Sequence, residues 1–117
     1  MTSGPLPRAV ERLLAESIPT AAHMEALLYL RAREGESVDV AGVATSIFAH
    51  VRVTGAILDD LCASGLIRRV QGRNEFRYAL LSDERRRVVD ALATLHRTNL
   101  VAVLQCIHEQ AARRGPT

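Results

Sequence analysis

The sequence VDVAGVATSIFAHVRVTGAILDDLCASGLIRRVQGRNEFRYALLS, residues 38–82, carries the most regular pattern in the chain. Apolar side chains repeat at helical spacing in two consecutive segments, and Gly65 ends the second of them. The pattern predicts a short helix from its capping residue Asp39 through Phe48. After the turn AHVR it predicts a second helix from about Val53 to Ser64.

Two extended segments follow the glycine. Alternating residues over Leu66–Val70 and Glu75–Leu81, separated by the turn sequence QGRN, predict a β-hairpin. Phe76, Tyr78 and Leu80 fall on one face of the second strand because side chains alternate along a strand. The fold class that we expect is therefore mainly α-helical with a small β-hairpin.

Helices are also expected on both sides of this stretch. Apolar spacing predicts a helix ending at Ile18, after a loose arm over residues 1–7. A final long helix begins after its capping residue Ser82 and runs to about Ala112. We expect it to be continuous or gently kinked, because no proline or glycine interrupts it, and the alternative is two helices with a kink near Thr98 and Asn99.

Three segments follow from this organisation. Residues 1–18 form an arm and a helix, residues 19–82 a central domain, and residues 83–117 a helical segment. A total of 117 residues fits one domain with a single core.

Composition restricts the protein class. No apolar run approaches the roughly 20 residues that a membrane helix needs, and the N-terminus lacks the pattern of a secretory signal. We therefore expect a cytoplasmic protein with no membrane partner. Cys62 and Cys106 lie far apart in the sequence, and we expect both to be reduced thiols that serve packing.

The sequence lacks the patterns of common catalytic and metal sites. It contains no glycine-rich phosphate loop, no serine elbow and no paired carboxylates in an acid–base context. The four histidines and two cysteines show no C-x-x-C or H-x-x-x-H spacing. We expect neither an enzyme nor a metal or other cofactor.

Positive charge is concentrated in the hairpin. The net charge is only +2, and all 15 basic residues are arginine, which codon bias in a GC-rich bacterial genome would explain. Residues 67–78 nevertheless hold four arginines and one glutamate. The favoured interpretation is contact with a DNA backbone, since arginine binds phosphate in a bidentate way. The alternatives are a solvated hairpin, or an internal pair of Arg68 or Arg69 with an acid.

A family resemblance supports the first interpretation. Residues 38–69, followed by GRNEFRYALLS at 72–82, resemble the MarR-type winged helix-turn-helix regulators of transcription. The resemblance extends from about Pro19 to Leu95, roughly two thirds of the chain. It implies a homodimer that binds double-stranded DNA sequence-specifically and dimerises through its terminal helices. A small-molecule effector is conceivable in such a protein, but no residue specifies one.

Candidate binding residues follow from this layout. The exposed N-terminal end of a recognition helix usually reaches base edges in the major groove, and the wing holds the backbone. The expected base-contacting residues are His50, Arg52, Thr54 and Ala56, and the expected backbone-contacting residues are Arg68, Arg69, Arg73 and Arg77.

An apolar stripe near the C-terminus predicts dimerisation. Only the first helix, with Leu13, is available in the sequence to cover this stripe, and an uncovered stripe is unfavourable in a monomer. The expected dimer residues are therefore Leu13, Leu100, Val103, Leu104 and Ile107.

A second function class remains open. Asp59 and Asp60 lie on the expected recognition helix, where acids oppose phosphate, and Gly55 weakens that helix by about 1 kcal/mol relative to alanine. The two aspartates, the modest net charge and the few polar residues on the recognition helix favour a winged-helix module that binds another protein and not DNA.

Overall fold

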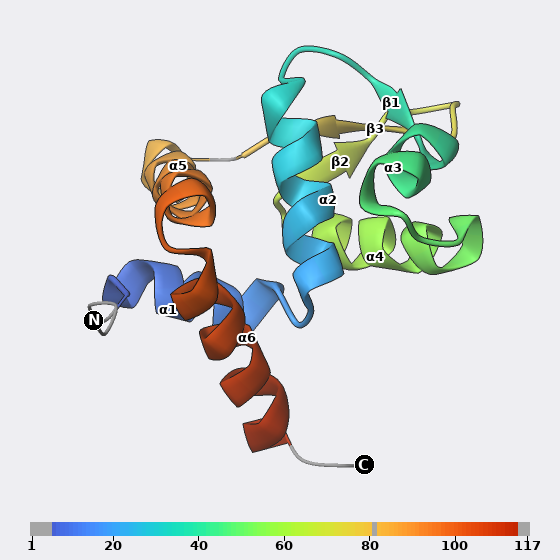
Figure 1. Cartoon of the computed structure of the whole chain (residues 1–117). Coiled ribbons are helices and arrows are strands. Elements are labelled where there is room, and N and C mark those ends of the chain that lie inside the picture. The colour runs from blue at the N-terminus through green and yellow to red at the C-terminus, as the bar shows by residue number, and fades with distance from the viewer. Residues whose placement is uncertain (1–5, 81, 115–117) are drawn as a thin grey trace. The chain divides into compact units, whose positions relative to one another are not determined.

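A computed structural model describes residues 6–80 and 82–114 (Figure 1). The chain divides into two compact units. The terminal unit joins the two ends of the chain, with its described residues at 6–21 and 82–114, and the central unit begins at residue 22. Residues 1–5 of the expected arm lie outside the described residues.

The described residues form six helices and three short strands. The terminal unit contains α1 (Arg8–Ser17), α5 (Asp83–Thr98) and α6 (Leu100–Arg114). The central unit contains α2 (Ala21–Ala32, whose first residue belongs to the terminal unit), β1 (Val38–Asp39), α3 (Val40–Ile47), α4 (Val51–Ala63), β2 (Ile67–Arg69) and β3 (Glu75–Tyr78).

The α3–α4 pair begins with the expected cap. The side chain of Asp39 accepts a hydrogen bond from the Gly42 backbone N–H at 2.8 Å. α3 ends one residue before Phe48, which adopts a left-handed conformation with φ 57°. A turn of three residues, 48–50, leads into α4, and the chain bends by 105° between the two helices.

α4 starts earlier than its spacing indicated. Its first residue is Val51, two positions before the expected Val53. The predicted inward face is confirmed, because Ile57, Leu58 and Leu61 are all buried. This apolar face anchors α4 in the core of the central unit.

The sheet has one strand more than the expected hairpin. Its order is β1-β3-β2, with both pairs antiparallel, and Val38 of β1 pairs with Phe76 of β3. Only two residues form β1, and the second of them, Asp39, is also the cap of α3, so the sequence shows no alternation that marks this strand. Phe76 and Tyr78, which were expected on one face of the strand, are both buried, whereas Leu80 lies beyond the end of β3 and is half-buried.

The preferred expectation of one continuous C-terminal helix is wrong, and the alternative of two helices describes the structure. Asn99 separates α5 from α6 with non-helical angles of φ −152° and ψ 49°. Asparagine has a low helix propensity because its side chain competes for backbone hydrogen bonds. The break allows α6 to pack on α1, and Val103 and Ile107 are buried within one chain.

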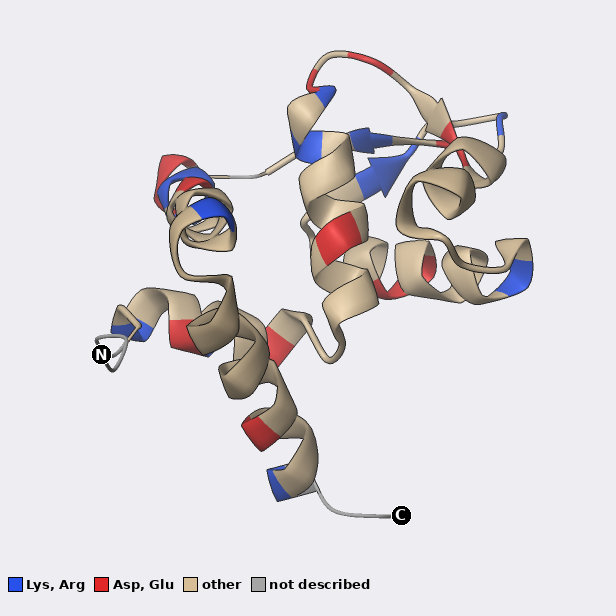
Figure 2. Cartoon of the chain, viewed as in Figure 1, with Lys and Arg blue, Asp and Glu red and all other residues tan. Residues whose placement is uncertain are grey.

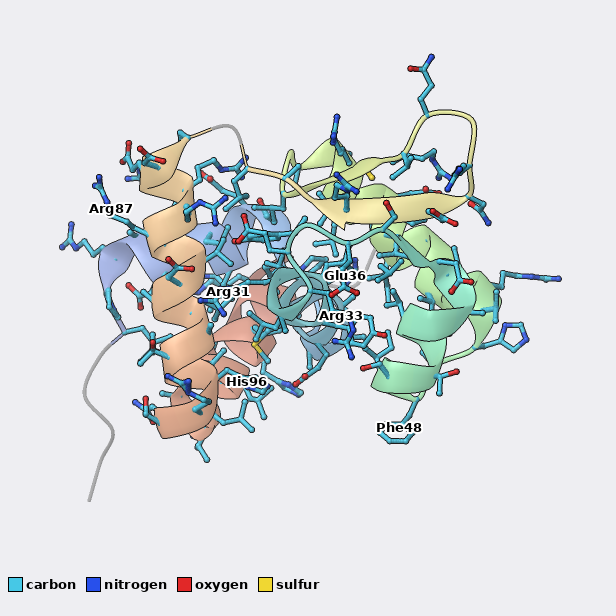
Figure 3. All side chains as sticks on the ribbon, turned by 90° about the horizontal axis from the view of Figure 1, so that it is seen from above. Arg31, Arg33, Glu36, Phe48, Arg87 and His96 are labelled. Atoms are coloured by element: carbon cyan, nitrogen blue, oxygen red, sulfur yellow. The ribbon has the colours of Figure 1, made fainter. Side chains whose placement is uncertain are left out.

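Phe48 offers a test of the α3–α4 turn. Its ring is 96% exposed and projects away from the helices (Figure 3), so the ring contributes little to packing. Its left-handed backbone costs a residue with a Cβ about 1 kcal/mol, and glycine does not incur this cost.

We therefore expect Phe48→Gly to be more stable than the matched variant Phe48→Ala by about 1 kcal/mol, because both remove the ring and only glycine relieves the backbone. Urea unfolding followed by circular dichroism measures the difference. Equal stabilities would contradict a left-handed residue at this position.

Candidate nucleic-acid interface

The first turn of α4 is held by His50. Its Nδ1 accepts a hydrogen bond from the backbone N–H of Arg52 at 3.0 Å, so His50 is the N-cap of the helix. One ring nitrogen is therefore engaged in capping, although the side chain stays exposed. The expectation that His50 lies at the exposed start of this helix agrees with the structure, and its second role as a cap was not foreseen.

Thr54 does not face solvent. The sequence analysis expected it to approach base edges, but it is fully buried and its hydroxyl donates to the backbone oxygen of His50 at 2.9 Å. Ile57, Leu58 and Leu61 follow it at positions +3, +4 and +7, which places all four on one helical face. That spacing was available in the sequence and marks Thr54 as inward-facing.

The opposite face of α4 is small and basic at its start. A helix turns by about 100° per residue, which directs Arg52 and Ala56 away from the buried face, and both are exposed. Gly55 lies beside them, and a Cβ built there would meet nothing within 4 Å. Backbone and short side chains therefore form this surface over the turn after Arg52, and Asp59 follows on the same face.

Both acids of α4 are engaged by basic groups. Asp59 Oδ1 lies 2.7 Å from Nη2 of Arg69 in β2, and Asp60 Oδ2 lies 2.8 Å from Nε2 of His23 in α2. The side chains of both aspartates are more than half exposed, so these pairs add little stability. They nevertheless place a compensating donor beside each carboxylate.

Arg69 therefore has an internal role. Its guanidinium donates to Asp59 and to the Asn74 side chain at 2.9 Å, and it lies 4.6 Å from the centre of the Phe76 ring. These contacts join α4, the hairpin turn and β3. Contact with a DNA backbone was the favoured expectation for Arg69. The structure instead shows the alternative for this residue, an internal pair with an acid.

Arg68 and Arg77 face each other across the strands. They are register partners in β2 and β3, and no ion pair involves either of them in the described part of the chain. Arg77 is half-buried, and its Nε is a buried donor without a hydrogen-bond partner among the described residues. Figure 2 shows basic positions on both strands and at the start of α4.

Arg73 lies at the hairpin turn and is mostly exposed. Its Nη1 is 3.8 Å from the Glu75 carboxylate, which pairs in register with Asp39 across β1 and β3. Arg73 thus offsets the charge of Glu75. Among the four hairpin arginines, Arg68 and Arg77 form the part with uncompensated positive charge.

The expected dimer residues divide into two groups. Leu13, Val103 and Ile107 are at most 7% exposed within a single chain, so the stripe is already largely covered. Leu100 is 37% exposed, Leu104 is half-buried, and the neighbouring Val101 is 62% exposed. The argument from an uncovered stripe is wrong for the first group, because the break at residue 99 brings α6 onto α1.

Both thiols are poorly activated. Burial raises the pKa of Cys62, and a nearby Asp59 raises it further while Arg69 opposes the change. Burial also raises the pKa of Cys106, with Glu11 acting in the same direction. A raised pKa lowers the thiolate fraction at neutral pH, which agrees with the expected packing role.

Thr54 allows a direct check of the α4 register. Thr54→Ala removes a buried methyl group and a hydrogen bond, and we expect it to lower the free energy of unfolding by about 1.5 kcal/mol relative to the control Thr45→Ala. Thr45 makes the same type of bond, to the Ala41 oxygen at 3.0 Å, but is exposed on α3. Chemical denaturation measures both variants, and equal losses would contradict the burial of Thr54.

No protein-family model, curated protein or solved structure matches the chain. Within the described ranges, no cluster of histidine, cysteine and acidic residues could hold a metal ion, and no single helix is long and apolar enough to cross a membrane. The bent pair α3–α4 would satisfy the length and composition criteria only when its two helices are counted together.

Proposed function

We propose that the protein is a MarR-like winged helix-turn-helix regulator of transcription that binds double-stranded DNA in the bacterial cytoplasm. In this proposal α3, the turn and α4 form the helix-turn-helix, and β2 with β3 form the wing. The bend of 105° between α3 and α4 supports it, since such helix pairs cross at about 90–120°.

The observation that carries the proposal is the arginine pair of the hairpin. Like charges directly opposite each other destabilise an antiparallel pair, yet Arg68 and Arg77 are register partners, and neither forms an ion pair with an acid among the described residues. An anion bound at this face would remove that repulsion. Phosphate is the anion that arginine binds most effectively through its planar fork.

The exposed face of α4 supports the same ligand. Arg52 points away from the core at the N-terminal end of the helix, where recognition helices usually contact base edges. Gly55 and Ala56 follow on this face and leave the helix backbone open to close approach. A long side chain at either position would hold the helix away from the floor of a groove.

The two aspartates of α4 both have partners inside the protein, which weakens their repulsion of a DNA backbone. Asp59 is paired with Arg69, and Asp60 is hydrogen-bonded to His23. Each carboxylate thus has a compensating donor before any phosphate approaches. Arg52, Arg68 and Arg77 are the basic residues of the α4–hairpin surface that form no ion pair within the described part of the chain.

A protein-binding module remains the alternative function, and Phe48 favours it. The side chain is 96% exposed next to the start of α4, and exposed aromatic residues commonly anchor protein interfaces. Binding through Phe48 would be apolar and nearly independent of salt. Binding through arginines and phosphates would depend steeply on salt.

We also propose that the protein acts as a homodimer. Leu100, Val101 and Leu104 remain at least partly exposed along α6. Leu104 also lines an apolar groove of about 460 Å³ with Ile107 and residues 19–21. A two-fold dimer would match the symmetry of a palindromic operator.

The DNA proposal is tested by selection of bound fragments from a random duplex library, followed by a salt titration on the enriched sequence. We expect a two-fold-symmetric site and a logarithmic salt slope of about −0.9 per phosphate contact. Arg68→Gln should weaken binding on every sequence and reduce that slope by about 1.

The matched control is Arg97→Gln, which removes one positive charge from an exposed position on α5. It should leave the slope unchanged. Equal effects of the two variants would show that only net charge matters. A folded protein that enriches no duplex at low salt would refute DNA binding and favour the protein-binding module.

The dimer proposal is tested with Leu104→Glu, which places a charge on the apolar groove of α6. We expect the mass measured by light scattering to fall from a dimer to a monomer, while circular dichroism confirms that the helices remain. Gln105→Glu is the control, because Gln105 is exposed and polar on the same helix. A dimer mass for both variants would refute α6 as the interface.

A further inference from the structure

Two valines at the start of α4 have no structural explanation. Val51 is 52% exposed and Val53 is 54% exposed. Valine has a low helix propensity, and its apolar side chain stabilises a fold mainly when it is buried. We propose that Val51 and Val53 recognise thymine methyl groups in the major groove and thereby select thymine-containing half-sites. This inference rests on the proposed function, in which the first turn of α4 enters that groove.

The helical geometry places the valines on opposite sides of Arg52. At about 100° per residue, Val51 projects to one flank of the helix and Val53 to the other, while Arg52 projects outward between them. When Arg52 points to the floor of the groove, the two valines point towards its two walls. The two valines therefore contact different base pairs, or bases on opposite strands of the same base-pair step.

Thymine offers the matching group at those positions. Its C5 methyl is the only apolar group on the major-groove edge of an unmodified base pair, and apolar side chains contact it directly. The methyl lies at the side of the edge nearest its own strand, which is where the flanks of a bound helix point. Arg52, at the centre, suits the O6 and N7 acceptors of guanine.

Charge favours DNA over an apolar protein partner at this surface. Arg52 separates the two valines and has no acid partner among the described residues. A hydrophobic protein surface that covered both valines would bury this guanidinium without a counter-charge, which is costly. A DNA groove accepts the cation and the methyl groups together.

The test uses the duplex enriched by the wild-type protein. Each thymine of a half-site is replaced singly by deoxyuridine, which removes only the C5 methyl. At two positions or more we expect affinity to fall about fourfold, the effect of one buried methyl group. Val51→Ala should abolish the uracil effect at one of these positions, and Val53→Ala at another.

Each valine variant is the control for the other, because both positions are exposed and both changes remove the same groups. Three results would overturn this inference. They are an enriched site without thymine, an affinity that does not change when uracil replaces thymine, and a loss of affinity on uracil substitution that persists in both valine variants. These results leave the proposed function intact, since DNA is still bound. A failure to enrich any duplex refutes the proposed function and this inference together.

Discussion

Burial of one face of α4 is the constraint on which the central unit depends. Thr54, Ile57, Leu58 and Leu61 lie on that face and are at most 4% exposed. Because the helix cannot rotate without exposing these side chains, the opposite face is determined as well. Arg52 must then point outward from the first turn, and the N-terminal end of the helix must remain accessible. The proposed DNA contact is a consequence of this packing.

Arg69 links this helix to the hairpin and limits the cost of its acids. Its guanidinium bonds Asp59 and Asn74 and lies over the Phe76 ring, so one side chain connects α4, the turn and β3. An arginine used in this way is unavailable for an unobstructed phosphate contact. In the proposed complex it reduces the repulsion that Asp59 would exert on DNA, and it leaves Arg68 and Arg77 as the hairpin arginines without an ion pair among the described residues.

Sequence patterns predicted what depends on local periodicity. The helices at residues 40–47 and 51–63, the two hairpin strands and the buried Ile57, Leu58 and Leu61 all follow from spacing and caps. They did not predict β1, which is two residues long, or the break at Asn99, which depends on packing between α6 and α1. For the candidate site they missed the double role of His50 and the contact between His23 and Asp60, and they gave an internal pair of Arg69 only as an alternative, because partners distant in sequence leave no periodic signal.

Features that lower the stability of the fold are concentrated between residues 48 and 55. Phe48 adopts a left-handed backbone with its ring exposed, Val51 and Val53 are exposed β-branched residues in a helix, and Gly55 lies mid-helix with open space where a Cβ would fit. Each feature lowers stability slightly without a compensating contact inside the protein. Elsewhere in α3 and α4, caps and apolar spacing agree with the fold. Proteins concentrate such conflicts at functional surfaces, because a ligand can supply the compensation. This clustering around Arg52 favours the start of α4 as the contact surface, independently of the hairpin charge.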